Sequence, residues 1–174
     1  RWDAYLATPF AAVAAVRAIR RIMNETPIDL VHANWLLPAA PIVASALRGR
    51  HQPMVVSCHG SGVFMAEKRA WAAAAARWGL ARAAALTACS RDLAHRVGVL
   101  DAGPKPEWIP YGVDVARFRP AAAEVRAERR ASFGRRLGVS PDAPWVLAVG
   151  RLVYKKGFEY LVRAMASVRV RVPD

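Results

Sequence analysis

The sequence has few cysteines, few acidic residues and no long apolar run, and each shortage excludes a class of protein. Its two cysteines, Cys58 and Cys89, form no C-x-x-C pair, so neither a disulfide framework nor a metal site is indicated. We expect both to be buried, reduced thiols. The longest apolar candidate, residues 35–47, is interrupted by prolines and a serine. It falls short of the roughly 20 apolar residues that span a bilayer, so we expect no membrane-spanning helix.

Acidic residues are outnumbered, with 26 Lys and Arg against 13 Asp and Glu and a net charge of +13. Such a charge is typical of proteins that bind nucleic acid, anionic lipid or phosphorylated ligands. The arginines are scattered through alanine-rich helices and do not alternate with aromatic residues, so we do not expect a nucleic-acid partner. A hydrophobic content of 55% indicates a globular protein rather than a disordered one.

Short apolar runs alternate with segments of helical periodicity along the chain. The spacing predicts strands at residues 28–33, 53–58, 84–89, 107–109 and 146–149, and helices at 6–23, 38–48, 67–82, 90–97, 124–137 and from 158 onward. This alternation is typical of βαβ units, so we predict an α/β fold with a parallel, doubly wound sheet. Trp71 and Trp78, seven residues apart on one predicted helix, are expected to pack in the core or line a cleft.

Ligands of such sheets bind at the carboxyl ends of the strands. The prediction places His32, His59, Ser90 and Arg151 at or just beyond such ends. Ser90 is also a good N-cap for the helix that follows it.

The segment from residue 145 to residue 157 predicts an anion site. A buried strand at residues 146–149 is followed by a turn with Arg151, Lys155 and Lys156, and then by a helix. The start of a helix presents unpaired N–H groups and a positive dipole end, and Gly157 lets a ligand approach the backbone. Such a turn suits a diphosphate, and a solvated basic turn is the alternative.

Five segments, in this order and spacing, carry a resemblance. They are DLVHANWLLP (29–38), VVSCHGSGV (55–63), LTACSRDLA (86–94), IPYGVDVARFRP (109–120) and VGRLVYKKGFEYLVRAMA (149–166). Together they resemble the family 4 retaining glycosyltransferases, which have the GT-B architecture of two facing Rossmann-like domains. The resemblance implies that residues 1–118 are most of the N-terminal, acceptor-side domain without its first strand. Residues 119–174 are then the interdomain segment and the incomplete start of the nucleotide-sugar-binding domain.

The resemblance also implies roles for the turn after residue 149. Arg151 and Lys156 would hold the diphosphate of the donor and stabilise the charge that builds on this leaving group, without a metal ion or a cofactor. Gly150 and Gly157 belong to the same donor-binding turn. Lys155 is interpreted as a solvated neighbour.

On the other domain, the resemblance implies that His59 forms a hydrogen bond to the donor sugar across the interdomain cleft. His59, Arg151 and Lys156 are thus the catalytic residues that it implies. His32 and Asn34 would line the acceptor side. The family often has Asp at the position of Gly62, so a contact of that Asp is lost or replaced here. Tyr111 belongs to a segment that resembles the family's interdomain turn, where Asn is commoner at this position.

The implied activity is transfer of a sugar from a nucleotide-diphosphate sugar to an acceptor hydroxyl, with retention, in carbohydrate biosynthesis. The partners would be the nucleotide sugar and a carbohydrate or lipid-linked acceptor, in the cytoplasm or peripherally on the inner face of an anionic membrane. Two alternatives stay open: a sugar-nucleotide epimerase of GT-B fold, and a non-catalytic basic module for anions or membrane surfaces. Motifs of the family that would precede and follow residues 1–174 are absent, so this segment alone is not expected to turn over.

Overall fold

The computed structural model describes residues 2–140 and 142–172, with the side chains from residue 9 onward. The chain divides into two compact units, Arg1–Val113 and Asp114–Asp174. The division lies a few residues before the predicted boundary at residue 118. The domain role predicted for each unit stays a prediction.

The first unit alternates helices and strands, as predicted. Its elements are α1 (Trp2–Glu25), β1 (Val31–Asn34), α2 (Ala39–Ala46), β2 (Met54–Cys58), α3 (Ser61–Lys68), α4 (Ala70–Leu80), β3 (Ala83–Ala88), α5 (Arg91–Gly98) and β4 (Glu107–Trp108). Ser90 caps α5: its Oγ accepts a hydrogen bond from the Leu93 N–H at 3.1 Å. The single helix predicted over residues 67–82 is wrong, because Arg69 has an extended backbone (φ −139°, ψ 118°) that separates α3 from α4.

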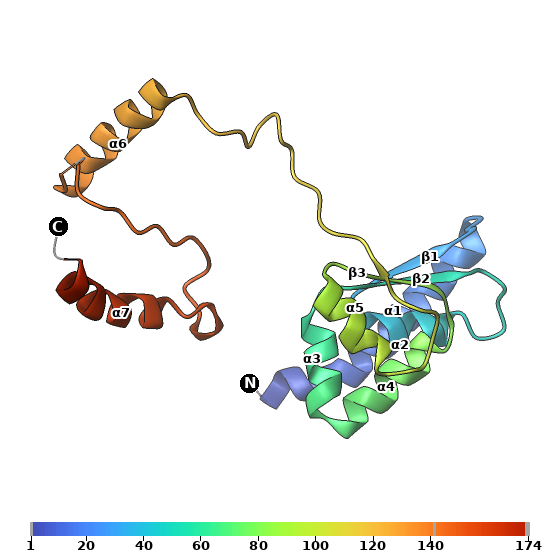
Figure 1. Ribbon diagram of the computed structural model, residues 1–174. Coiled ribbons are helices and arrows are strands. Elements are labelled where there is room, and N and C mark those ends of the chain that lie inside the picture. The colour runs from blue at the N-terminus through green and yellow to red at the C-terminus, as the bar shows by residue number, and fades with distance from the viewer. Residues whose placement is uncertain (1, 141, 173–174) are drawn as a thin grey trace. The chain divides into compact units, whose positions relative to one another are not determined.

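The strands form one parallel sheet in the order β1-β2-β3-β4. Each connection therefore leads to the neighbouring strand, and all the connections run across the sheet in the same direction. Because such crossovers are right-handed, they place their helices on one face of the sheet, and Figure 1 shows the helices on one side of the strands. The parallel α/β fold is as predicted. The described residues supply one of the two helical layers that a doubly wound sheet has.

The core lies between β2 and the helical layer. The burial of β2 alternates, so that Met54, Val56 and Cys58 are fully buried while Val55 and Ser57 are only partly buried. Alanines at the contacts let the helices approach closely, and α4 packs against both α2 and α3. The helical side of the sheet is thus well packed, and its other side carries the partly buried side chains.

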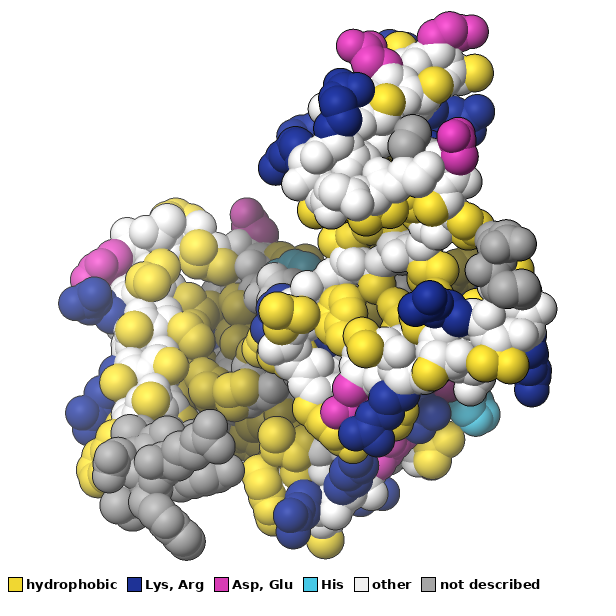
Figure 2. Space-filling view, turned by 90° about the vertical axis from the view of Figure 1, so that its left-hand side faces the viewer, with side chains coloured by type: hydrophobic (Ala, Val, Ile, Leu, Met, Phe, Trp, Pro, Cys, Tyr) yellow, Lys and Arg dark blue, Asp and Glu magenta, His cyan; other side chains and the backbone are white. Residues whose placement is uncertain are grey.

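The tryptophans of α4 do not pack in the core, which is one of the two places predicted for them, and Trp78 lines a groove instead. Trp71 is 66% exposed and Trp78 is 46% exposed. The buried face of α4 is formed instead by small residues, which fit close to α2 and α3. Lys and Arg side chains lie among hydrophobic ones on the face drawn in Figure 2. Within residues 2–140 and 142–172, no helix is long and apolar enough to cross a membrane.

The second unit has α6 (Ala123–Leu137), the 3-10 turn η1 (Tyr154–Lys156) and α7 (Phe158–Arg171). Gly138 ends α6 in the left-handed conformation (φ 65°), as its position predicts. The strand predicted at residues 146–149 does not form: Leu147 is 85% exposed and Val149 is 88% exposed. A strand needs a neighbouring backbone with which to pair, and the described part of this unit contains none.

The packing around Gly62 leaves no room for the Asp that the family often has at this position. Gly62 is buried at the start of α3, where a Cβ would lie 2.6 Å from the Leu37 backbone nitrogen and 3.3 Å from the Leu36 Cβ. Any side chain at this position would therefore push α3 away from the segment that follows β1.

We expect Gly62→Ala to lower the free energy of unfolding by about 1–3 kcal/mol, because the added methyl group overpacks this contact. Urea denaturation of the variant and the wild type measures the difference. Gly98→Ala is the matched control, since a Cβ there would be 3.9 Å from its nearest neighbour, Pro106. The control should stay within about 1 kcal/mol of wild type. Equal losses in both variants would contradict the close contact.

Candidate functional site

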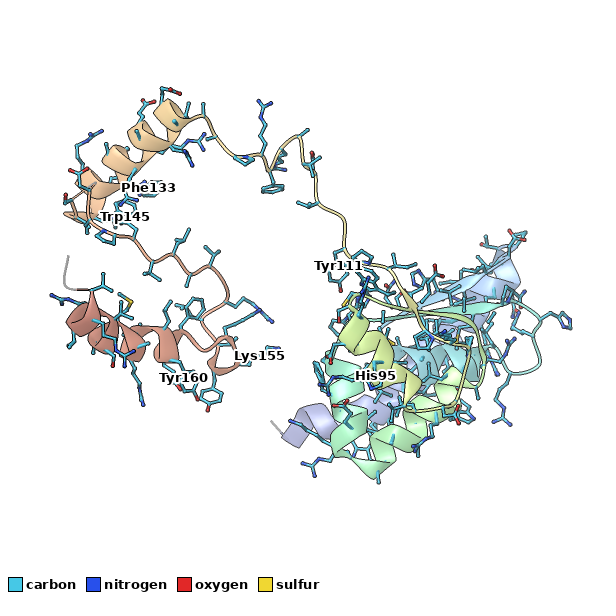
Figure 3. The ribbon with its side chains drawn as sticks, viewed as in Figure 1. His95, Tyr111, Phe133, Trp145, Lys155 and Tyr160 are labelled. Atoms are coloured by element: carbon cyan, nitrogen blue, oxygen red, sulfur yellow. The ribbon has the colours of Figure 1, made fainter. Side chains whose placement is uncertain are left out.

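The carboxyl ends of the parallel strands gather polar residues at one edge of the sheet. Asn34 ends β1, His59 directly follows β2, Cys89 directly follows β3, and Tyr111 comes shortly after β4. Figure 3 shows Tyr111 where the chain leaves this sheet. These residues lie far apart in the sequence, and the parallel register brings them together.

His59 is the centre of this cluster, because both of its ring nitrogens have partners. Nε2 lies 3.3 Å from the Asn34 Oδ1, and Nδ1 lies 2.5 Å from the Tyr111 hydroxyl. A carbonyl oxygen only accepts, so Nε2 carries the proton and donates it to Asn34. In the tautomer that carries its proton on Nε2 alone, Nδ1 is the acceptor and the Tyr111 hydroxyl donates to it. The two contacts hold the imidazole in one orientation.

Tyr111 fits the role of donor. Its ring stacks on His59, with ring centroids 5.7 Å apart and an angle of 15° between the planes. A hydrogen bond with the Cys89 side chain, followed by desolvation, raises the pKa of Tyr111 above its ordinary value. The phenol therefore keeps its proton at neutral pH and can donate it to His59.

The helix that begins beside His59 adds an electrostatic contribution. Gly60 adopts φ 114°, which an L side chain rarely does, and its carbonyl accepts the first hydrogen bonds of α3 from Val63 and Phe64. The amino terminus of α3 thus starts within two residues of the imidazole. Its positive dipole end favours an electron-rich ligand atom at this edge.

His32 lies within β1, two residues before its end, and its Nε2 is 2.8 Å from the Ser57 Oγ. Its predicted acceptor-side role stays a prediction. The Ser57 Oγ is in turn 2.8 Å from the Thr87 Oγ1. These three side chains form a polar row across β1, β2 and β3. Of the predicted acceptor-side pair, only Asn34 lies next to His59.

The predicted donor residues other than His59 lie in the second unit and are described there. Arg151, Lys155 and Lys156 are exposed, and η1 ends at Gly157, which adopts φ 68° directly before α7. Gly150 lies against this turn, because a Cβ on it would be 3.3 Å from the Phe158 ring and 4.0 Å from the Lys156 Cδ. The helix and the turn are as predicted. Arg151 follows an extended segment instead of a strand.

Metal ligands do not gather in the part of the chain that the structure describes. No group of three or more His, Cys, Asp or Glu side chains there could hold a metal ion. The expectation that the reaction needs neither metal nor cofactor stays a prediction.

Sequence reasoning missed the contact between Tyr111 and His59. The pattern assigned Tyr111 to a turn, although Pro110 and the short strand before it place it after a strand end. The rule that ligands bind at the carboxyl ends of parallel strands, which identified His59 as a candidate, applies to Tyr111 as well. The hydroxyl row of Ser57 and Thr87 carried no such signal, since both lie inside apolar strands.

A parallel α/β sheet with crossover helices and a polar cluster at its carboxyl edge is the architecture of a Rossmann-like domain. The family model described as Glycosyltransferase Family 4 matches residues 5–117, and the chain belongs to this family. The resemblance read from the motifs and the predicted fold class, a Rossmann-like domain of the GT-B type, are thereby confirmed.

Several characterised relatives are similar over most of the chain. It is 34% identical, over 90% of its length, to a "GDP-mannose-dependent alpha-(1-6)-phosphatidylinositol monomannoside mannosyltransferase" of Mycolicibacterium smegmatis. It is 28% identical, over 100% of its length, to a "GDP-mannose-dependent monoacylated alpha-(1-6)-phosphatidylinositol monomannoside mannosyltransferase" of Corynebacterium glutamicum. It is also 27% identical, over 89% of its length, to a "2-deoxystreptamine glucosyltransferase" of Streptomyces kanamyceticus. The chain spans 39%, 44% and 42% of the lengths of these relatives.

We expect Tyr111→Phe to release the tautomer of His59. The wild type should show Nε2–H in ¹⁵N NMR spectra, and the variant should shift the tautomer ratio about fivefold toward Nδ1–H, since a hydrogen bond contributes about 1 kcal/mol. Ser57→Ala is the control, because it removes a hydroxyl from the neighbouring row only. An unchanged ratio in Tyr111→Phe would show that Tyr111 does not orient the imidazole.

The two cysteines should differ in reactivity. Cys58 is 0% exposed, and burial, together with the charge of Cys89, raises its pKa to about 12. Only about one Cys58 thiol in 10⁴ is then ionised at pH 8, and the thiolate is the reactive form. Iodoacetamide should label Cys89, which is partly exposed, well before Cys58, as mass spectrometry of the native protein can measure. Equal labelling rates would contradict the burial of β2.

Proposed function

We propose that the protein is a glycosyltransferase that moves a sugar from a nucleotide-diphosphate donor to an acceptor hydroxyl, with retention of configuration. The observation that carries this proposal is the doubly hydrogen-bonded His59 at the carboxyl edge of the sheet. An imidazole held in one tautomer can recognise a sugar hydroxyl through a directed hydrogen bond. Membership of the chain in the family supports the same reaction.

His59 has a defined part in this proposal. Its contact with Asn34, at 3.3 Å, is long for a hydrogen bond, whereas the contact with Tyr111, at 2.5 Å, is short. A sugar hydroxyl can therefore replace Asn34 as the acceptor of the Nε2 proton at little cost. Tyr111 keeps the ring in place during the exchange.

Arg151 and Lys156 bind the diphosphate in this proposal. As the glycosidic bond breaks, negative charge builds on the nucleoside diphosphate that leaves. A guanidinium and an ammonium that are already in place stabilise this charge. The unpaired N–H groups at the start of α7, directly after Gly157, add to the same effect.

The relatives suggest which donor and which acceptor to test first. The mannosyltransferases described above are named as GDP-mannose-dependent and as acting on a phosphatidylinositol monomannoside. We infer GDP-mannose as the donor and a lipid-linked acceptor that the protein reaches from the cytoplasmic face of a membrane. The glucosyltransferase among the relatives makes a nucleotide-diphosphate glucose the donor to compare.

The alternatives have less support. The relatives described above are named as transferases, whereas an epimerase would release an altered nucleotide sugar from donor alone. Product analysis with donor and no acceptor distinguishes these two. A non-catalytic basic module would bind polyanions without preferring nucleoside diphosphates.

We expect Arg151→Ala in the full-length protein to lower the rate of transfer by on the order of 100-fold, which corresponds to about 3 kcal/mol of transition-state stabilisation. Lys156→Ala should likewise weaken binding of GDP. Isothermal titration with GDP, UDP and ADP measures the second effect and identifies the base of the donor.

Lys155→Ala is the matched control for this test. It removes the same charge one residue away, and we expect it to leave GDP affinity nearly unchanged because Lys155 is interpreted as a solvated neighbour. Equal effects on GDP affinity at positions 155 and 156 would indicate a solvated basic turn without a specific diphosphate site. An unchanged rate in Arg151→Ala would remove the role given to that residue.

A further inference from the structure

The outer face of α4 is apolar, although it faces solvent. Trp71 and Trp78 lie two turns apart on this face, 66% and 46% exposed, with the exposed Ala74 between them. The opposite face is apolar as well and is buried against α2 and α3 through Ala72, Ala76, Gly79 and Leu80. A helix on the surface of a globular protein normally carries polar residues on its outer face. This helix has one charged residue, Arg77.

Exposed tryptophans of this kind are typical of a surface that lies at the boundary between water and an apolar environment. The indole ring has a large apolar area and a polar N–H, so it is favoured where one side of it is apolar and the other is wet. Such a place is the interface between a lipid bilayer and water, where tryptophans are enriched.

A basic groove borders α4 on the side of α5. It has a volume of about 760 Å³, and its cations are Lys68, Arg69, Arg77 and Arg96. His95 of α5, labelled in Figure 3, also lines it. Its carboxylates, Glu67 and Asp92, are both paired with Arg96, at 2.9 and 2.8 Å. Lys68, Arg69 and Arg77 therefore give the groove an excess of positive charge.

A second groove borders α4 on the side of α2. It has a volume of about 510 Å³ and contains Trp78 together with Arg48, Arg50 and Arg82. Arg82 is anchored through hydrogen bonds to the carbonyl oxygens of Arg50 and Gln52, at 3.0 and 3.1 Å. No carboxylate lines this groove among the described residues. The tryptophans of α4 are thus flanked by cations on both sides.

We propose that the outer face of α4, with its two basic grooves, docks the protein on an anionic lipid bilayer. Trp71 and Trp78 enter the interface, and the flanking cations bind lipid phosphates, each contributing through the negative surface potential. The choice of a bilayer rests on the proposed function, whose acceptor is lipid-linked. The surface itself follows from exposure and charge.

Charge complementarity excludes a second copy of the chain as the occupant. In a two-fold symmetric contact the same surface faces itself, so the cations around α4 would oppose one another. An anionic headgroup layer instead neutralises them. The same charges favour phosphatidylinositol over a zwitterionic lipid.

The test uses the full-length protein without sugar donor, and vesicles of phosphatidylcholine with or without phosphatidylinositol. We expect co-sedimentation with the anionic vesicles only, weakened by salt. Trp71→Ala/Trp78→Ala should lower the affinity about tenfold. Lys68→Glu/Arg69→Glu should lower it at least about 25-fold, about fivefold for each lost cation, and reduce the salt dependence.

Trp108→Ala is the matched control, because Trp108 is 43% exposed but lies on β4, where Arg91 stacks on it at 4.4 Å. It should bind vesicles like the wild type. Brominated lipid should quench wild-type tryptophan emission, and Trp71→Phe/Trp78→Phe should abolish this quenching. Circular dichroism and GDP titration confirm that each variant is folded.

Three outcomes would overturn the proposal. They are absence of binding to phosphatidylinositol vesicles, wild-type affinity in Trp71→Ala/Trp78→Ala, and a dimer in light scattering that the tryptophan variant dissociates. The titration with GDP contains no lipid. Failure of docking is therefore distinguishable from failure of the proposed function.

Discussion

Parallel pairing of β2 with both of its neighbours is the constraint on which the first unit depends. It points the strands in the same direction, so that their carboxyl ends meet at one edge of the sheet. Residues 34, 59 and 111, which the sequence keeps far apart, become hydrogen-bonding partners there. The same pairing requires crossover helices, and the buried alternation of β2 holds them against one face. The parallel pairing of β2 therefore positions both the polar cluster around His59 and the hydrophobic core.

Features of the fold that depend on local chemistry were predictable. The apolar run 53–58 contains β2, the hydroxyl of Ser90 caps α5, and glycines stand at the end of α6 and the start of α7. The apolar run at 146–149 looked equally convincing, but a strand is completed by a partner that the run itself does not encode. The break at Arg69 and the exposed tryptophans of α4 escaped prediction because periodicity identifies a face without saying what covers it.

The candidate site divides in the same way. His59 and Asn34 could be predicted from the motifs and from their position at strand ends, and the structure brings them together. Tyr111 required knowledge of which strand lies next to which, since it reaches His59 across β3. His32 lies two residues before the end of β1, because this strand begins and ends later than the apolar pattern predicts.

The sequential order of the strands has a consequence for how the first unit is made. Each strand pairs with the one that precedes it in the chain, so the long-range pairings are all between consecutive βα segments. When β2, β3 or β4 is synthesised, the strand with which it pairs has therefore already been made. This order of pairing favours folding segment by segment as the chain leaves the ribosome.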